Sequence, residues 1–229
     1  MRLKKIVTKN LAVAALGLVL AAGAWAQNPC NVPNNGSGTV TLPPVGCEYL
    51  SPSQVHMIIA GLPAGTTIIL QPIHKNFICR QTGTCNTPGG TLGGETETFG
   101  STATFQVSGT GTLAGWSRVI SIPLNTVVDS APRTPGAPVQ TFNTDMRRIQ
   151  GAITGDPDFA SLQIVGGSAN GFSSPGTTTL TRQSNGTFNV SSAFNVGYSI
   201  SFTGSSTGRL KGLSGTTKGT VEMKAYAKQ

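Results

Sequence analysis

Charged residues are scarce in this sequence, which has 8 acidic and 16 basic side chains among 229 residues. This low charge density argues against a disordered polyelectrolyte and against a coiled coil rich in Glu, Lys and Leu. Only two His are present, so side chains suited to acid–base catalysis are few. Aromatic residues make up only 6% of the chain. We therefore expect a protein that is not an enzyme.

Long apolar runs are also lacking, except for residues 11–23 near the N-terminus. Four basic residues precede this run, and Ala24-Trp25-Ala26 matches the small-x-small cleavage rule. The sequence predicts a signal peptide at 1–26 and a protein exported to the periplasm or the extracellular space; an uncleaved anchor is the alternative. The mature chain has 12 basic and 8 acidic residues, a net charge of +4, which is a weak indication of nucleic-acid binding. We expect neither a membrane span nor a specific nucleic-acid partner.

Glycine, threonine, serine and proline dominate what is present, with 30, 30, 20 and 14 residues. This bias favours β-structure with many turns. Apolar and polar residues alternate over 101–108, 194–202 and 220–227, which is typical of strands with one buried face. Shorter stretches of strand character lie at 38–42, 55–60, 66–73, 117–127, 147–154, 161–166 and 176–183. The sequence predicts an all-β protein, built as an antiparallel β-sandwich.

A shift of 97 residues aligns 105–117 with 202–214, where seven of thirteen positions are identical. Chance similarity between strands rich in Gly, Ser and Thr is one explanation, but the shared Phe and Leu favour an internal duplication. We expect two related β units, or one sandwich with pseudo-twofold symmetry. Prolines at every third position mark 132–138 as a connector between a first unit at 27–131 and a second at 139–229.

The cysteines Cys30, Cys47, Cys79 and Cys85 are even in number, which indicates two disulfides in an exported chain. Three pairings are possible. We favour Cys30–Cys47 and Cys79–Cys85, because each closes a local loop. The first would stabilise the fold by about 3 kcal/mol for a loop of that size.

Two local motifs resemble catalytic signatures without their context. Gly204–Gly208 has the GxSxG pattern, but no helical pattern and no later His follows it. Gly109, Gly111 and Ala114 fit GxGxxA, but the residues that follow alternate like a strand. Gly111 and Gly115 fit turn or bulge positions better. We assign no catalytic residue.

Four acidic residues, Glu95, Glu97, Asp156 and Asp158, form two local pairs. A carboxylate-dependent hydrolase needs two such groups within about 5–10 Å in one cleft, which the sequence does not report. Asp156 and Asp158 fit turn chemistry better than a calcium loop, although calcium binding stays an alternative.

His56, His74 and the four cysteines all fall within 30–85, but their spacing matches no metal-binding pattern. We expect no metal and no other cofactor. The neighbouring Lys75 favours a position for His74 at the end of a strand.

The C-terminal stretch is basic, with Arg209, Lys211, Lys218, Lys224 and Lys228. These side chains are expected to protect a solvated strand edge, and a contact with an anionic polymer is the alternative. Trp116 is the sole Trp after cleavage and a candidate for stacking on a sugar. Its counterpart in the repeat is Leu213, which favours a packing role.

Several stretches together resemble a family of exported bacterial β-rich proteins without an established activity. They are LPAGTT at 62–67, PRTPGAPVQTF at 132–142, TDM at 144–146, GDPDF at 155–159, SPGTTTLTR at 174–182 and LSGTTKGT at 213–220. The resemblance implies export and a β-rich fold, and nothing about mechanism.

The sequence therefore favours an exported, non-enzymatic protein with a structural or surface-interaction role. Exposed strand edges would allow self-association. The alternatives are a module that binds an extracellular polysaccharide or another polyanion, and the hydrolase described above.

Overall fold

The structure, a computed structural model, describes residues 28–52, 57–59, 62–79 and 85–228. The signal peptide predicted at 1–26 and His56 lie outside these residues. The strands are β1 (Cys30–Val32), β2 (Cys47–Leu50), β3 (Met57–Ile59), β4 (Ile68–Ile78), β5 (Asn86–Pro88), β6 (Glu95–Gly109), β7 (Ser117–Ser130), β8 (Val139–Thr154), β9 (Phe159–Gly166), β10 (Pro175–Arg182), β11 (Phe188–Gly204) and β12 (Ser214–Ala227). Short 3-10 helices are η1 (Pro63–Gly65), η2 (Gly111–Leu113) and η3 (Ser168–Asn170). The predicted all-β class is confirmed.

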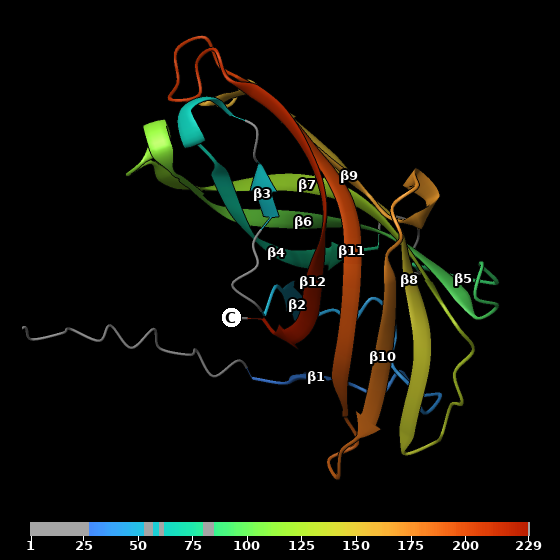
Figure 1. The fold of residues 1–229 in the computed structure, drawn as a ribbon. Coiled ribbons are helices and arrows are strands. Elements are labelled where there is room, and N and C mark those ends of the chain that lie inside the picture. Colours follow the sequence, from blue (N-terminus) through green and yellow to red (C-terminus); the bar gives the residue numbers. More distant parts are fainter. Residues whose placement is uncertain (1–27, 53–56, 60–61, 80–84, 229) are drawn as a thin grey trace, which may run out of the picture.

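Eight strands form a closed antiparallel barrel (Figure 1). Their order around the ring is β2-β4-β6-β7-β8-β10-β11-β12, and β12 pairs with β2 to close it. This corrects the predicted sandwich, because the pairing of β4 with both β2 and β6 leaves no break that would divide the strands into two facing sheets. Closure also removes most of the free edges that would favour self-association.

The barrel is long because β8 and β11, with 16 and 17 residues, each pair with two strands in succession. β10 lies between their halves at one end, and β9 lies between their halves at the other end. Strands of this length span roughly 50 Å. Figure 1 shows β9 and β10 following each other along the wall of the barrel.

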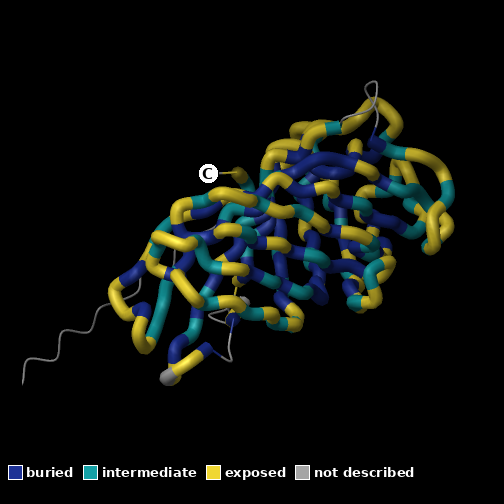
Figure 2. Tube along the Cα trace, turned by 90° about the horizontal axis from the view of Figure 1, so that it is seen from above, coloured by how far each residue is buried: buried dark blue, intermediate teal, exposed yellow. Residues whose placement is uncertain are grey.

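One apolar core fills the barrel, and Figure 2 shows the buried residues along its inner side. The predicted alternation holds in β6, where Ala103, Phe105 and Val107 are buried. Strands before and after the connector at 132–138 contribute to this core, and β7 pairs with β8 across it.

Residues 33–46 form a segment that we call the plug. It leaves β1 beside β11, reaches the β7–β8 connection and returns to β2. Gln140 donates to the carbonyl of Gly38 (2.7 Å) and accepts from the hydroxyl of Thr39 (2.7 Å), and Arg133 donates to the carbonyl of Val40 (2.7 Å). The strand predicted at 38–42 is therefore wrong, because side chains of the β7–β8 connection and of the start of β8 bond to this backbone.

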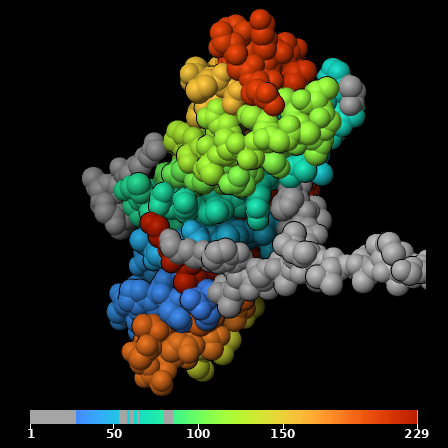
Figure 3. Space-filling model, turned by 90° about the vertical axis from the view of Figure 1, so that its left-hand side faces the viewer, coloured from blue at the N-terminus to red at the C-terminus, as the bar shows by residue number. Residues whose placement is uncertain are grey.

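Both predicted disulfides are confirmed. Cys30–Cys47 joins the two ends of the plug, and Cys79–Cys85 closes a short loop. Figure 3 shows the plug region in blue beside the β10–β11 turn in orange, at the far end of the molecule from the red β11–β12 turn. The plug therefore covers one end of the barrel.

The two segments of the predicted repeat occupy equivalent hairpins, β6–η2–β7 and β11–β12. Their turns at 111–116 and 208–213 share a bonding pattern, with Ala114 and Lys211 donating to Gly111 and Gly208, and Trp116 and Leu213 donating to Leu113 and Leu210. Gly115 and Gly212 have φ of 80° and 76°, which favours glycine at both turns. Origin by duplication, and the division into two units, stay predictions.

Candidate functional site

Trp116, the candidate for sugar stacking, lies in the core and is 8% exposed. Its indole N–H donates to Asp158 Oδ2 (3.2 Å), and its ring lies 6.3 Å from that of Phe159. A stacking platform needs an exposed ring face. The burial of Trp116 therefore fits the packing role.

The basic residues of the C-terminal stretch do not gather in one patch. They follow β12 from the β11–β12 turn, which holds Arg209 and Lys211, to Lys228 near the C-terminus, over a distance of roughly 45 Å. Lys224 is 3.1 Å from Glu222, and Lys228 donates to Asn76 (3.0 Å). This spacing resembles a solvated strand more than a binding site.

The two acidic pairs lie at opposite ends of the barrel. Arg118 binds Asp156 (2.7 Å) and Asp158 (2.9 Å) and pairs with Val107 of β6, whereas Glu97 is ten residues away along that strand. Ten residues of strand correspond to roughly 33 Å. Glu97 and Asp158 are therefore too far apart to act as the carboxylate pair of a hydrolase in one cleft.

Asp156 and Asp158 organise the turn between β8 and β9, as turn chemistry predicts. Burial raises the pKa of Asp158, but donors from Arg118, Arg209 and Trp116 outweigh burial and lower the pKa below its ordinary range. Asp156 accepts from the backbone N–H of Asp158 (2.9 Å). Arg118 thus provides the positive charge that these carboxylates need.

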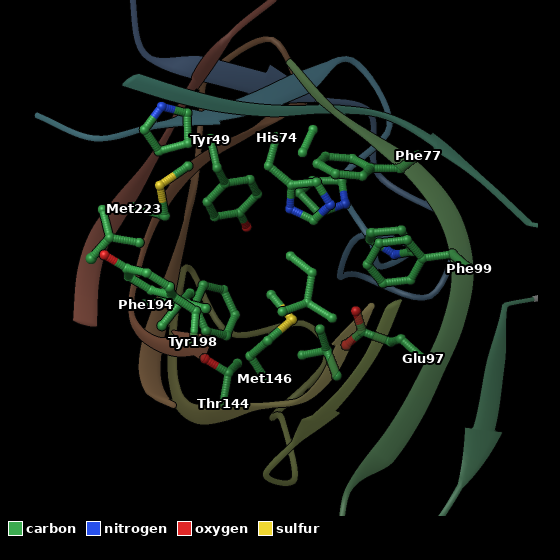
Figure 4. Close-up of a pocket in the computed structure, with 18 of the residues that line it drawn as sticks. Tyr49, His74, Phe77, Glu97, Phe99, Thr144, Met146, Phe194, Tyr198 and Met223 are labelled. Carbon is green, nitrogen blue, oxygen red and sulfur yellow. The ribbon is translucent and has the colours of Figure 1, made fainter. Parts of the chain in front are cut away.

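The candidate site is an internal cavity in the barrel (Figure 4). The cavity has a volume of about 60 Å³. This volume corresponds to about four water molecules. The largely apolar wall combines residues of all eight barrel strands and of β9 with three residues of the plug; it includes Leu42, Pro43, Pro44, Phe77, Phe99, Phe105, Met146, Phe194, Val196 and Met223.

Two chains of hydrogen bonds hold polar groups at this wall. His74 Nε2 bonds to Ser101 Oγ (2.7 Å), which bonds to Thr126 (2.8 Å). Burial lowers the pKa of His74 to about 4, so its ring is neutral at pH 7. The predicted position of His74 at a strand end is wrong. Asn76, with φ of 57°, forms part of an irregularity that lets β4 continue to Ile78.

Tyr49 belongs to the second chain. Its hydroxyl donates to Ser192 (3.1 Å), which bonds to Thr178 (2.7 Å). Burial raises the pKa of Tyr49, its hydrogen bond to Ser192 lowers it, and Glu97 raises it further. The phenol is therefore neutral, and its hydroxyl points towards the middle of the cavity (Figure 4).

Glu97 and Thr144 differ from these groups because they lack partners. Both side chains line the cavity and are 3% and 4% exposed. Among the described residues, nothing bonds to the buried Oε1 of Glu97 or to Oγ1 of Thr144. Burial raises the pKa of Glu97 well above its ordinary value; nearby Glu95 and Asp129 raise it further, and Arg133 opposes them. Burial thus favours the neutral carboxylic acid over the carboxylate.

Sequence reasoning missed Glu97 as an interior residue, although its signal was present. Glu97 has the same parity along β6 as Ala103, Phe105 and Val107. An acid on the inward face of a half-buried strand indicates either a buried partner or a site.

The wall offers hydrogen bonds and aromatic faces without a basic side chain, since no Lys or Arg lines the cavity in the described part of the chain. The same described residues contain no cluster of three or more His, Cys, Asp or Glu able to hold a metal ion. In residues 28–52, 57–59, 62–79 and 85–228, no helix is long and apolar enough to cross a membrane.

Comparisons with known proteins give no relative for this fold or site. The chain matches no family model, no curated protein and no solved structure.

Proposed function

We propose that this chain is an exported, non-enzymatic binding protein that holds a small, mainly apolar molecule inside its barrel. The observation that carries the proposal is the internal cavity, whose largely apolar wall holds one buried oxygen of Glu97 and one of Thr144 that find no partner in the part of the chain that the structure describes.

Energetics support a ligand at this place. An unpartnered buried polar group costs about 1–3 kcal/mol, so its presence in a folded protein calls for an explanation. Small-molecule sites combine an apolar wall with a few polar groups that orient the ligand, and barrel interiors are common places for them. Glu97 and Thr144 have the character of such orienting groups.

Self-association and binding of an extracellular polysaccharide are the rival proposals. Because the barrel is closed, free strand edges lie on short strands such as β1, β3 and β5. This weakens the support for self-association through strand edges. The dispersed basic side chains of β12 likewise give the polysaccharide proposal little support. The cavity therefore supports an internal ligand better than either rival.

The test uses the exported protein, purified without reduction. Benzene, 1-butanol and butylamine are titrated calorimetrically, and we expect saturable binding of at least one probe with a stoichiometry near one. Absence of binding by all three probes at millimolar concentration would overturn the proposal.

A matched pair of variants locates the binding. Val196 lines the cavity, and Val119 is 57% exposed. Val196→Phe fills the cavity and should abolish binding, whereas Val119→Phe should bind as the wild type does. Thermal unfolding confirms that both variants are folded; if Val196→Phe fails to fold, Val196→Leu replaces it. Unchanged affinity in the folded filling variant would place the probes elsewhere and contradict the proposal.

A further inference from the structure

We propose that the ligand carries an amine, which Glu97 and Thr144 recognise inside the cavity. This inference rests on the proposed function and specifies the chemistry of the ligand.

The first argument is the position of the two side chains. Glu97 on β6 pairs with Val128 on β7, which pairs with Met146 on β8, two residues from Thr144. Both residues thus project from the inner face of strands separated by one strand, and the two-residue offset along β8 places their backbones about 12 Å apart. Figure 4 shows them on the same side of the cavity with Met146 between them. The remaining space suits one small head group in contact with both.

The second argument is charge. Arg133 is the cation whose charge lowers the pKa of Glu97. It already forms an ion pair with Glu95 and donates to the carbonyl of Val40 in the plug. Asp129 adds negative charge on the same side. The other titratable side chains at the wall are His74, Tyr49 and Tyr198. Burial lowers the pKa of His74 and raises the pKa of both tyrosines, so all three are neutral at pH 7. An ammonium ion is the head group that would stabilise the carboxylate form of Glu97, and the negative charge of Glu95 and Asp129 would oppose an anionic head group.

The third argument is the aromatic wall. Rings surround the cavity from several strands, and Figure 4 shows those of Tyr49, Phe77, Phe99, Phe194 and Tyr198. Aromatic faces attract ammonium groups, most strongly where water is excluded. The same rings accept the alkyl part of a slender amine. The cavity volume of about 60 Å³ limits that part to a few carbon atoms unless the wall moves.

Binding has a defined proton balance. An alkylamine reaches the protein as an ammonium ion, and burial favours the protonated form of Glu97 before the amine binds. The complex shares one proton between amine and carboxylate, so one proton passes to the buffer. Affinity for the ammonium ion should consequently rise with pH while the amine stays protonated, because the proton of Glu97 leaves more readily.

The experiment compares butylamine, 1-butanol and butanoate on the full exported protein by calorimetry in two buffers of different ionisation enthalpy. We expect butylamine to bind tightest and to release about one proton, and 1-butanol to release none. Glu97→Gln should weaken butylamine about 10- to 100-fold, as for a lost charge-assisted hydrogen bond, and abolish the proton release. Thr144→Val should weaken butylamine less, about 3- to 10-fold.

Glu222→Gln is the matched control, because it makes the same chemical change at a half-exposed residue of β12. It should leave the affinity for butylamine and the proton release unchanged. Equal affinities for butylamine and 1-butanol, with no effect of Glu97→Gln, would overturn the amine while leaving the apolar binding function intact. Preference for butanoate would also overturn it. Failure of every probe would instead overturn the binding function itself.

Discussion

Asp158 and Glu97 are buried acids at opposite ends of the barrel, and they differ in their hydrogen-bond partners. At the β8–β9 turn, Asp158 accepts hydrogen bonds from Arg118, Trp116 and the backbone of Arg209 at 2.8–3.2 Å. Towards the plug, Glu97 is also buried, but its Oε1 has no partner among the described residues. The pKa of Asp158 is lowered and that of Glu97 is raised.

Asp129 shows that the difference in pKa follows from the hydrogen-bond partners of the acid and not from the end of the barrel at which it lies. It lies near Glu97 and is fully buried, yet Thr91 and Thr96 donate to it at 2.6–2.7 Å and Arg147 lies 3.6 Å away. Burial raises the pKa of Asp129, and these donors outweigh burial to lower it. A buried acid with donors holds a loop in place, whereas a buried acid without donors is a candidate ligand contact.

The largest expected effect comes from the same chemical change made at both acids. Asp158→Asn should lower the free energy of unfolding by about 3–4 kcal/mol, because Arg118 loses part of its compensation and an amide N–H₂ meets donors. Glu97→Gln should cause no such loss at pH 7. Urea unfolding of both variants measures the contrast.

The pH dependence sharpens that contrast. The raised pKa of Glu97 means that the folded state holds its proton more tightly than the unfolded state. Its contribution to stability is present at low pH and is lost as pH rises above the ordinary carboxyl range. Glu97→Gln should therefore gain stability relative to the wild type as pH rises, and a constant difference would show that Glu97 has an ordinary pKa.

His74 should give an effect of about 3 kcal/mol with the opposite dependence on pH. Its pKa is about 4 in the folded protein against 6.5 as the ordinary value. Protons therefore favour the unfolded state, so stability is present above pH 6.5 and is lost as pH falls to 4, by about 3 kcal/mol. His74→Gln should remove this loss, which urea unfolding at pH 7 and pH 4 detects. An equal acid loss in both proteins would assign it to other groups.

Alternation in the sequence predicted the strands whose contacts are regular, and not the way they close. β6, β11 and β12 are long enough for the pattern to identify their inner faces. Closure depends on β2, which has four residues and pairs with residues 23 or more positions away. A strand that short carries no readable period, so neither the barrel nor its cavity followed from the pattern.

The local disulfides were predictable for the opposite reason, since loop closure between near neighbours depends little on the rest of the fold. The plug shows where local reading fails. Residues 38–42 resemble a strand, but Gln140 of β8 and Arg133 of the β7–β8 connection, both distant in sequence, bond to them. The missing partners of Glu97 and Thr144 likewise depend on which strands face each other.

The smallest expected effect compares two threonines on neighbouring strands of the cavity wall. Thr144 on β8 has an unpartnered hydroxyl, and Thr178 on β10 bonds to Ser192 (2.7 Å). Valine keeps the shape and the β-branching of threonine, so each substitution chiefly removes a hydroxyl. Thr144→Val should raise the free energy of unfolding by about 1 kcal/mol and Thr178→Val should lower it by about 1 kcal/mol, because only the second loses a hydrogen bond. Urea unfolding of both variants tests this prediction. A loss of stability in Thr144→Val would reveal a partner for its hydroxyl, such as a bound water, and Thr144 would then no longer be a candidate ligand contact.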